Sequence, residues 1–189
     1  QTARQAPQQQ APQEEAARDQ GDPGRAPEAP RVLLNFNNQT VRQIVRLTLG
    51  GERLRVVVSN TWGTAPLELG GAHVGLQANG SAIAPDSDRA LTFSGNSAIT
   101  IPAGAVVVSD PVALSFPAFA DLAIDIYLPG NTAASTSPLT THGSGGRTNY
   151  VSPPGDYTGI ANMPVMETSQ AWFFLARVDV AASEQVGAV

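Results

Sequence analysis

Residues 37–67, NNQTVRQIVRLTLGGERLRVVVSNTWGTAPL, decide the fold class of this chain. Successive side chains of a β-strand point to opposite faces, and the stretch alternates with that period on both sides of a Gly-Gly pair. Glycine adopts the positive φ angles that a tight hairpin turn requires. The stretch therefore predicts a β-hairpin with valine and leucine on one face. The opposite, solvated face would carry Arg42, Arg46, Arg53 and Arg55.

The rest of the chain repeats this signal in shorter pieces. Residues 120–128 and 171–180 alternate apolar with polar side chains, and the second stretch would turn Trp172 toward the core. Glycine, proline, asparagine and aspartate separate the short runs between them, as they do in all-β proteins. No segment has the apolar period of an amphipathic helix. We therefore expect an all-β fold over residues 32–182, an antiparallel two-sheet β-sandwich of jelly-roll type.

The two ends and the overall composition narrow the possibilities further. Residues 1–31 contain mainly Gln, Ala, Pro and charged residues. Such a segment cannot bury enough apolar surface to offset its ordering entropy, so it predicts a disordered tail, while residues 183–189 read as a linker. The net charge of −5 argues against a nucleic-acid partner, and no apolar run approaches the ~20 residues of a membrane span. The absence of cysteine excludes disulfides and thiolate chemistry.

Catalytic and metal-binding patterns are weak. A serine nucleophile needs a base, and only His73 and His142 are available. His73 lies in an alternating run typical of a structural strand residue, and His142 lies in a glycine-rich loop that is not a G-x-S-x-G elbow. Asp86 and Asp88 could offer oxygens to calcium, but Pro-Asp-Ser-Asp is more simply a turn. We expect no catalytic residue, metal site or cofactor in this chain.

Binding residues are better indicated. Aromatic side chains at loop edges can form protein-docking sites or platforms for sugar rings, and Trp62 and Tyr150 occupy such positions. The candidate binding residues, for either a docking face or a glycan platform, are Asn60, Trp62, Gly63, His142, Asn149 and Tyr150.

Several stretches also resemble, in order, successive motifs of one known domain. They are NNQTVRQIVRLTLGG, SNTWGTAPL, GAHVGL, SDRALTFSG, IPAGAVVVSDPV, DLAIDIYLPG, THGSGGRTNYVSPPGDYTG and WFFLARVDV. Together they resemble the amino-terminal β-rich domain that precedes the catalytic domain in a bacterial group of secreted SGNH/GDSL-type ester hydrolases, which includes xylan-esterase-like members.

The resemblance implies a non-catalytic accessory domain, secreted or extracytoplasmic, that packs on an SGNH catalytic domain in cis and shapes the cleft for a polysaccharide ester. The family's Gly-Asp-Ser and Gly-x-Asn-Asp blocks have no counterpart in these 189 residues, and neither histidine follows an aspartate by three positions. The family's catalytic residues therefore do not carry over. The alternative interpretation is a stand-alone carbohydrate-binding β-sandwich module.

Overall fold

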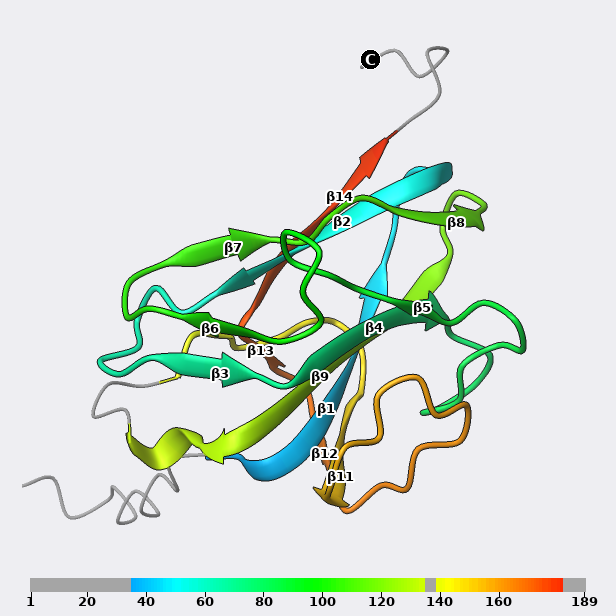
Figure 1. The fold of residues 1–189 in the computed structure, drawn as a ribbon. Coiled ribbons are helices and arrows are strands. Elements are labelled where there is room, and N and C mark those ends of the chain that lie inside the picture. The colour runs from blue at the N-terminus through cyan, green and yellow to red at the C-terminus, as the bar shows by residue number, and fades with distance from the viewer. Residues whose placement is uncertain (1–34, 135–138, 182–189) are drawn as a thin grey trace, which may run out of the picture. The chain divides into compact units, whose positions relative to one another are not determined.

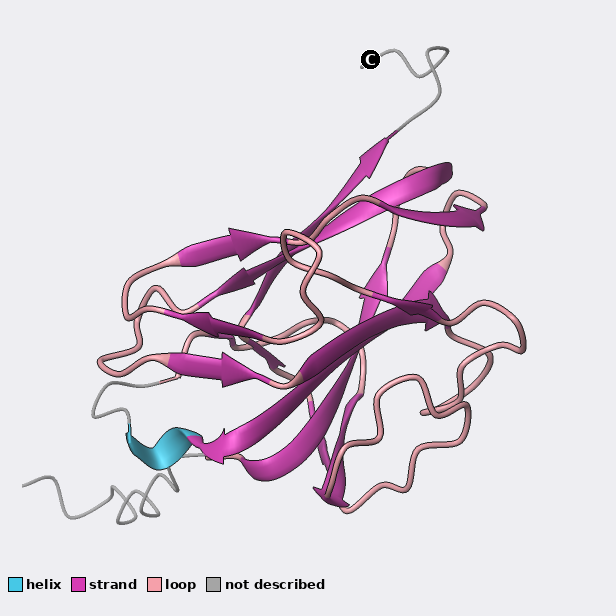
Figure 2. Ribbon diagram, viewed as in Figure 1, coloured by secondary structure: helices cyan, strands magenta, loops and turns pink. Residues whose placement is uncertain are grey.

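The computed structural model describes residues 35–134 and 139–181, so the tail at 1–31 and the linker at 183–189 lie outside the described residues. Nearly all regular structure is β-strand (Figure 2), and the helix found in the described part is one 3-10 turn, η1 (Thr132–Ala134). No helix within these residues is long and apolar enough to cross a membrane. The prediction of an all-β fold is confirmed.

Two larger antiparallel sheets pack across a common core (Figure 1). The first has six strands, in the spatial order β12 (Glu167–Ser169), β11 (Asn149–Pro154), β1 (Asn37–Arg46), β9 (Asp121–Asn131), β4 (Gly71–Leu76) and β5 (Arg89–Ala90). The second has four, in which β2 (Gly51–Ser59) pairs with β14 (Leu175–Ala181), β7 (Val106–Val108) and β8 (Val112–Phe116). The arrangement is a β-sandwich-like fold.

Two small antiparallel pairs complete the fold. β3 (Leu67–Leu69) pairs with β6 (Ile99–Ile101), and β10 (Thr141–His142) pairs with β13 (Trp172–Phe173). Leu67, Leu69 and Ile101 are buried members of the main core, so the β3–β6 pair closes one side of it.

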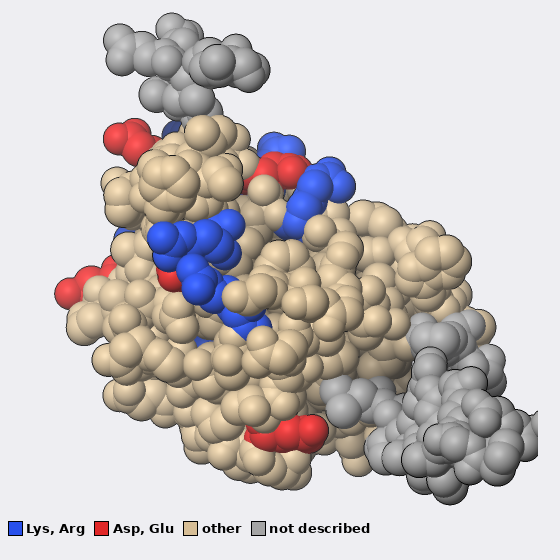
Figure 3. Space-filling model, turned by 180° about the vertical axis from the view of Figure 1, so that it is seen from behind, with Lys and Arg blue, Asp and Glu red and all other residues tan. Residues whose placement is uncertain are grey.

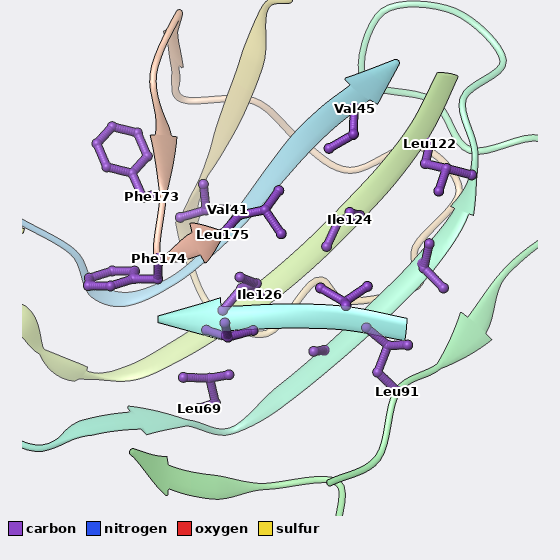
Figure 4. Close-up of a cluster of buried hydrophobic side chains, with 14 of the residues drawn as sticks. Val41, Val45, Leu69, Leu91, Leu122, Ile124, Ile126, Phe173, Phe174 and Leu175 are labelled. Atoms are coloured by element: carbon purple, nitrogen blue, oxygen red, sulfur yellow. The ribbon is translucent and has the colours of Figure 1, made fainter. Parts of the chain in front are cut away.

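The core contains the side chains that strand alternation places inside. Leu122, Ile124 and Ile126 of β9 lie together in it (Figure 4), and Val56 and Val58 of β2 belong to the same cluster. Burying an aliphatic side chain of this size contributes about 1.5–3 kcal/mol. This alternating row therefore supplies much of the free energy that holds the two sheets together.

The outer face of the six-stranded sheet is covered as well. Segments 77–88 and 155–166 lie over it, and Ile83 from the first of these packs with Ile44 and Ala123 in a second, smaller cluster. The middle of β1 is consequently buried on both faces. Residues that alternation assigns to solvent on this sheet are interior.

The predicted hairpin at 37–67 is wrong. β1 pairs with β9 and β11, whereas β2 pairs with β14, β7 and β8, so the Gly-Gly segment carries the chain from one sheet to the other. Neither glycine has a positive φ. A Cβ on Gly50 would lie 2.9 Å from the Ala118 nitrogen, and one on Gly51 would lie 2.9 Å from Val180 Cγ1. Close packing, not turn geometry, requires glycine here.

The second alternating run, 171–180, is interrupted. Phe174 has φ of 60°, so β13 ends before it and β14 begins after it, and the two strands pair with different partners. Phe173, Phe174 and Leu175 are consecutive and all buried. Trp172 is half-buried at the edge of the core, where its Nε1–H donates to the Ile44 carbonyl at 3.0 Å.

Candidate functional site

A buried ion pair lies between the six-stranded sheet and the segments that cover it. Arg42 of β1 is 0% exposed and contacts Asp125 of β9 through two hydrogen bonds, Nε to Oδ1 at 2.6 Å and Nη2 to Oδ2 at 2.7 Å. The same guanidinium donates to the carbonyls of Ser81, Ile160 and Ala161. One side chain therefore ties both covering segments to the sheet.

The surroundings of Asp125 decide its ionisation. Burial raises the pKa of the Asp125 carboxyl, while the Arg42 guanidinium and the Gly159 N–H, which donates to Oδ2 at 3.0 Å, oppose that rise. Gly159 has φ of 71°, and a Cβ there would lie 2.6 Å from His73 Nδ1. His73 in turn contacts Asp88 Oδ2 at 2.8 Å. The whole network is a polar seam that holds segment 155–166 against β4 and β9.

This seam corrects the predicted arginine face. Arg42 is interior, Arg46 is exposed on the six-stranded sheet, and Arg53 and Arg55 are exposed on the four-stranded sheet. The four do not share a face, because β1 and β2 belong to different sheets. Seen from behind, basic side chains form small groups with acidic side chains beside them on a mostly uncharged surface (Figure 3).

The loop after β2 places three of the predicted binding residues. Asn60 is buried, and its Nδ2 donates to the carbonyls of Ala65, Ile101 and Pro102. A Cβ on Gly63 would lie 1.9 Å from Asn60 Oδ1, so the position has no room for a side chain. Trp62 is 67% exposed, and its backbone N–H donates to Thr140 Oγ1. Asn60 and Gly63 therefore fix the conformation of the loop, and Trp62 is the side chain that the loop exposes to solvent.

A pocket opens beside this loop. Its volume is about 330 Å³, and its lining includes Asn60, Gly63, Leu67, Glu68, Asn131 and Phe174. Leu67 and Phe174 are buried core residues, so its floor is apolar. The pocket can accept an apolar group that carries a polar end.

Asn149 and Tyr150 lie elsewhere, on β11. Asn149 is fully buried; its Oδ1 accepts from the Ile44 N–H and its Nδ2 donates to the Ala171 carbonyl. The Asn149 side chain therefore makes the hydrogen bonds to these two backbone groups that a neighbouring strand would otherwise make. Tyr150 packs on the Ile44–Ile83–Ala123 cluster and lines a second pocket of about 330 Å³ that shares no residue with the one beside Trp62.

His142 and the acidic turn occupy separate places. His142 packs edge-on against Trp172, with ring centroids 6.0 Å apart. In residues 35–134 and 139–181, neither histidine is hydrogen-bonded to a serine or threonine hydroxyl, and no three acidic or histidine side chains gather as metal ligands. Asp88 pairs with His73, while the Arg89 guanidinium donates to the Asp86 and Asp88 carbonyls.

Sequence reasoning missed two features. The pairing of Arg42 with Asp125 joins strands far apart in the chain, and the only signal for it was a charged residue in the middle of each apolar strand. The polar pocket around Tyr150 draws on Gln77, Asp121 and Arg147. No local motif links these residues, because separate strands and loops contribute them.

The candidate residues therefore form several distinct places, not one site. Asn60, Trp62 and Gly63 belong to one loop; Tyr150 belongs to the outer face of the six-stranded sheet; His142 packs edge-on against Trp172. No protein-family model matches the chain, and no curated protein matches it either.

Proposed function

We propose that this chain is a non-catalytic β-sandwich domain of a bacterial SGNH/GDSL-type ester hydrolase, and that it packs on the catalytic domain of the same protein. The ordered series of motifs in the sequence supports the family. In such a parent, acyl transfer to a serine and hydrolysis of the acyl-enzyme take place in the catalytic domain. A secreted or extracytoplasmic location, and a polysaccharide ester as substrate, belong to the same proposal.

The observation that carries the docking role is the presentation of Trp62. Buried Asn60 and close-packed Gly63 are explained by the loop's own geometry, whereas the indole of Trp62 is 67% exposed. Exposed tryptophans held on rigid supports are typical anchors of protein interfaces, because they bury a large apolar area at a small cost in conformational entropy. The hydrogen bonds of Asn60 and of the Trp62 backbone hold the loop in one conformation, which supports docking of a second domain on Trp62.

The neighbourhood of the loop is suited to the same role. Val106 of β7 pairs with Ser59 at the start of the loop and is itself half-exposed. The pocket lined by Asn60 and Gly63 can receive a side chain from the docked domain. An exposed indole in a loop that adjoins an apolar strand edge and lines a pocket has the composition of an interface centre.

The first test is the coding sequence that follows Val189. We expect it to continue into a Gly-Asp-Ser block shortly afterwards. A stop codon at that point would contradict the proposal and favour a stand-alone module.

The second test compares the isolated chain with its longer parent by hydroxyl-radical footprinting and mass spectrometry. We expect Trp62 to be modified readily in the isolated chain and protected in the parent. Phe119, which is 63% exposed at another turn, is the matched control and should react equally in both. Equal labelling of Trp62 in the two proteins would overturn the docking face.

The isolated chain should also fail to hydrolyse p-nitrophenyl acetate above the background rate. Enzyme-like turnover that Ser144→Ala abolishes would refute a non-catalytic role. The second candidate function, a carbohydrate-binding module, is favoured by the polar pocket that Tyr150 lines. Trp62 lines neither this pocket nor the one beside its own loop.

A further inference from the structure

The pocket at Tyr150 differs in chemistry from the one beside the Trp62 loop. It has a volume of about 330 Å³, and its lining includes Gln77, Asp121, Arg147, Thr148, Tyr150 and Gln170. Five of these six side chains are aliphatic with a polar end: two amides, a carboxylate, a guanidinium and the threonine hydroxyl. The sixth, Tyr150, adds an aromatic face. The named lining is therefore mostly polar, with one aromatic ring.

The charged groups of the pocket are held in place by one another. Asp121 Oδ2 accepts from Arg46 Nη1 at 2.8 Å, and Asp121 Oδ1 accepts from Arg147 Nε at 3.3 Å. This arrangement uses only the Nε of Arg147. Within the described residues, the two terminal nitrogens of Arg147 have no hydrogen-bond partner. They remain available to a ligand, in a fixed fork that two adjacent oxygens can accept from.

The amides add acceptors and donors at the same rim. Gln77 Nε2 donates to the Gly80 carbonyl, and Gln170 Nε2 donates to Thr148 Oγ1. Each amide is thereby oriented, and in the described part of the chain the Oε1 atoms of both glutamines accept no hydrogen bond. The pocket thus offers acceptors from two amides and donors from one guanidinium.

The Tyr150 ring is a supported platform. It rests on the cluster of Ile44, Ile83 and Ala123 and still lines the pocket. The ring therefore cannot rotate freely into solvent. A planar apolar face beside amide and guanidinium groups matches a ligand that is apolar on its ring face and polar around its edge.

We propose that this pocket binds one sugar ring of a glycan. A pyranose has C–H groups on its faces, which pack on an aromatic ring, and hydroxyl groups around its edge, which both donate and accept hydrogen bonds. The Gln77 and Gln170 oxygens would accept from hydroxyls, and the Arg147 terminal nitrogens would donate to two neighbouring ones. The volume lies at the small end of the range of ligand pockets, which suits one ring of a longer chain.

The charge balance favours a neutral ligand over an anion. Asp121 lies between Arg46 and Arg147 and contacts both, so its carboxylate already occupies the place that an anion would take. The site is open to solvent. Dissolved salt screens an exposed arginine, so its attraction for a free anion is weak. This inference rests on the second candidate function, a carbohydrate-binding module, and gives that function a site; it is independent of the docking role, because it concerns a different surface from the Trp62 loop.

The test titrates the full chain with neutral hexasaccharides (xylohexaose, cellohexaose, mannohexaose and chitohexaose) and follows backbone amide resonances by NMR. We expect saturable shifts at Gln77, Arg147, Thr148, Tyr150 and Gln170 with at least one of the four. Arg147→Gln and Gln170→Ala alter exposed polar ends and leave the core unchanged. Each variant should weaken binding by about tenfold, the usual effect of losing a hydrogen bond with a charged or well-oriented partner.

Two control variants make the assignment specific. Tyr150→Phe keeps the ring and its packing, so it should bind within a few-fold of the parent chain. Trp62→Ala should bind equally well. Circular dichroism and thermal unfolding establish that each variant is folded before it is titrated.

Three results would overturn the proposal. The first is the absence of saturable shifts with all four hexasaccharides at millimolar concentration. The second is loss of glycan binding in Trp62→Ala with retention in Arg147→Gln, which would move the site to the loop. The third is saturation of the same resonances by inorganic phosphate and not by glycan, which would make this an anion site. None of these outcomes changes the footprint of Trp62 in the longer parent, so the two proposals fail separately.

Discussion

Replacing Arg42 with methionine should destabilise this protein more than replacing any other arginine in β1 or β2. Methionine keeps most of the length of the side chain, but it leaves the Asp125 carboxylate buried without its partner. It also removes the donor from three carbonyls in the covering segments, those of Ser81, Ile160 and Ala161. The change therefore acts on the sheet and on both segments at once.

The magnitude follows from the burial of both partners, whose side chains are 0% exposed. Removing one partner of a buried, hydrogen-bonded ion pair costs about 3–5 kcal/mol. Domains of this kind are stable by only about 5–15 kcal/mol, so the variant should lose a large share of its free energy of unfolding. For a domain of this size, that loss corresponds to a fall in Tm of about 6–20 °C.

Arg46→Met is the matched control. Arg46 lies four residues, or two strand repeats, along the same strand and also contacts an aspartate, but its side chain is 47% exposed. Exposed pairs contribute about 0–1 kcal/mol. The double variant Arg42→Met/Asp125→Leu removes both buried charges and should recover much of the loss, because no uncompensated charge remains.

Urea denaturation with linear extrapolation measures all three variants. Hydrogen exchange adds a local readout, because the Ile83 N–H donates to the Ala161 carbonyl between the two covering segments and should lose protection in Arg42→Met. If Arg42→Met and Arg46→Met cost the same, within about 0.5 kcal/mol, the buried seam does not stabilise the fold and the reasoning is refuted.

Three further predictions concern single side chains. Gly63→Ala should cost about 1–3 kcal/mol in chemical denaturation, since its Cβ would meet Asn60 Oδ1, whereas a null effect would show that the loop relaxes freely. Asn149→Ala should cost about 1–3 kcal/mol for each backbone group left unpaired, such as the Ile44 N–H; a Tm unchanged from the parent would contradict the bridging role. Hydrogen bonds from the Thr92 hydroxyl and the Gly95 N–H lower the pKa of Asp110 below its ordinary 3.8. A lowered pKa stabilises the fold above the unfolded value and loses that effect as pH falls through the folded value, so the Tm difference between the parent and Asp110→Asn should be constant above about pH 5 and shrink below it. A difference that persists at about pH 2 would exclude this role.

Local periodicity predicted the strand at 120–128 and its inward face, although it failed over the interrupted run at 171–180. Leu122, Ile124 and Ile126 alternate in the sequence and face the core in the structure, because the direction of a side chain in a strand depends only on its place in the repeat. The all-β class followed from the same signal. Trp62 and Asn60 were also recognisable as residues of a loop.

Strand partners could not be read in this way. The Gly-Gly pair at 50–51 has the sequence of a hairpin turn, yet β1 and β2 enter different sheets. A glycine can be required because its φ is positive or because a neighbour leaves no room for a side chain. Only the positions of Ala118 and Val180 in the structure show that the second reason applies here. The interruption at Phe174 could not be predicted from the sequence either. Phenylalanine rarely adopts a left-handed φ, so the residue type gives no reason to expect one here.

The candidate surfaces show the same division. The residue types in the chain indicated a β-rich domain with exposed aromatics, because composition and alternation are local properties. Whether Arg42 meets water or Asp125, and whether Gln77 and Arg147 meet around Tyr150, depends on which distant segments cover the six-stranded sheet. Contacts of that kind arise from the packing of segments 77–88 and 155–166, and no stretch of sequence encodes them alone.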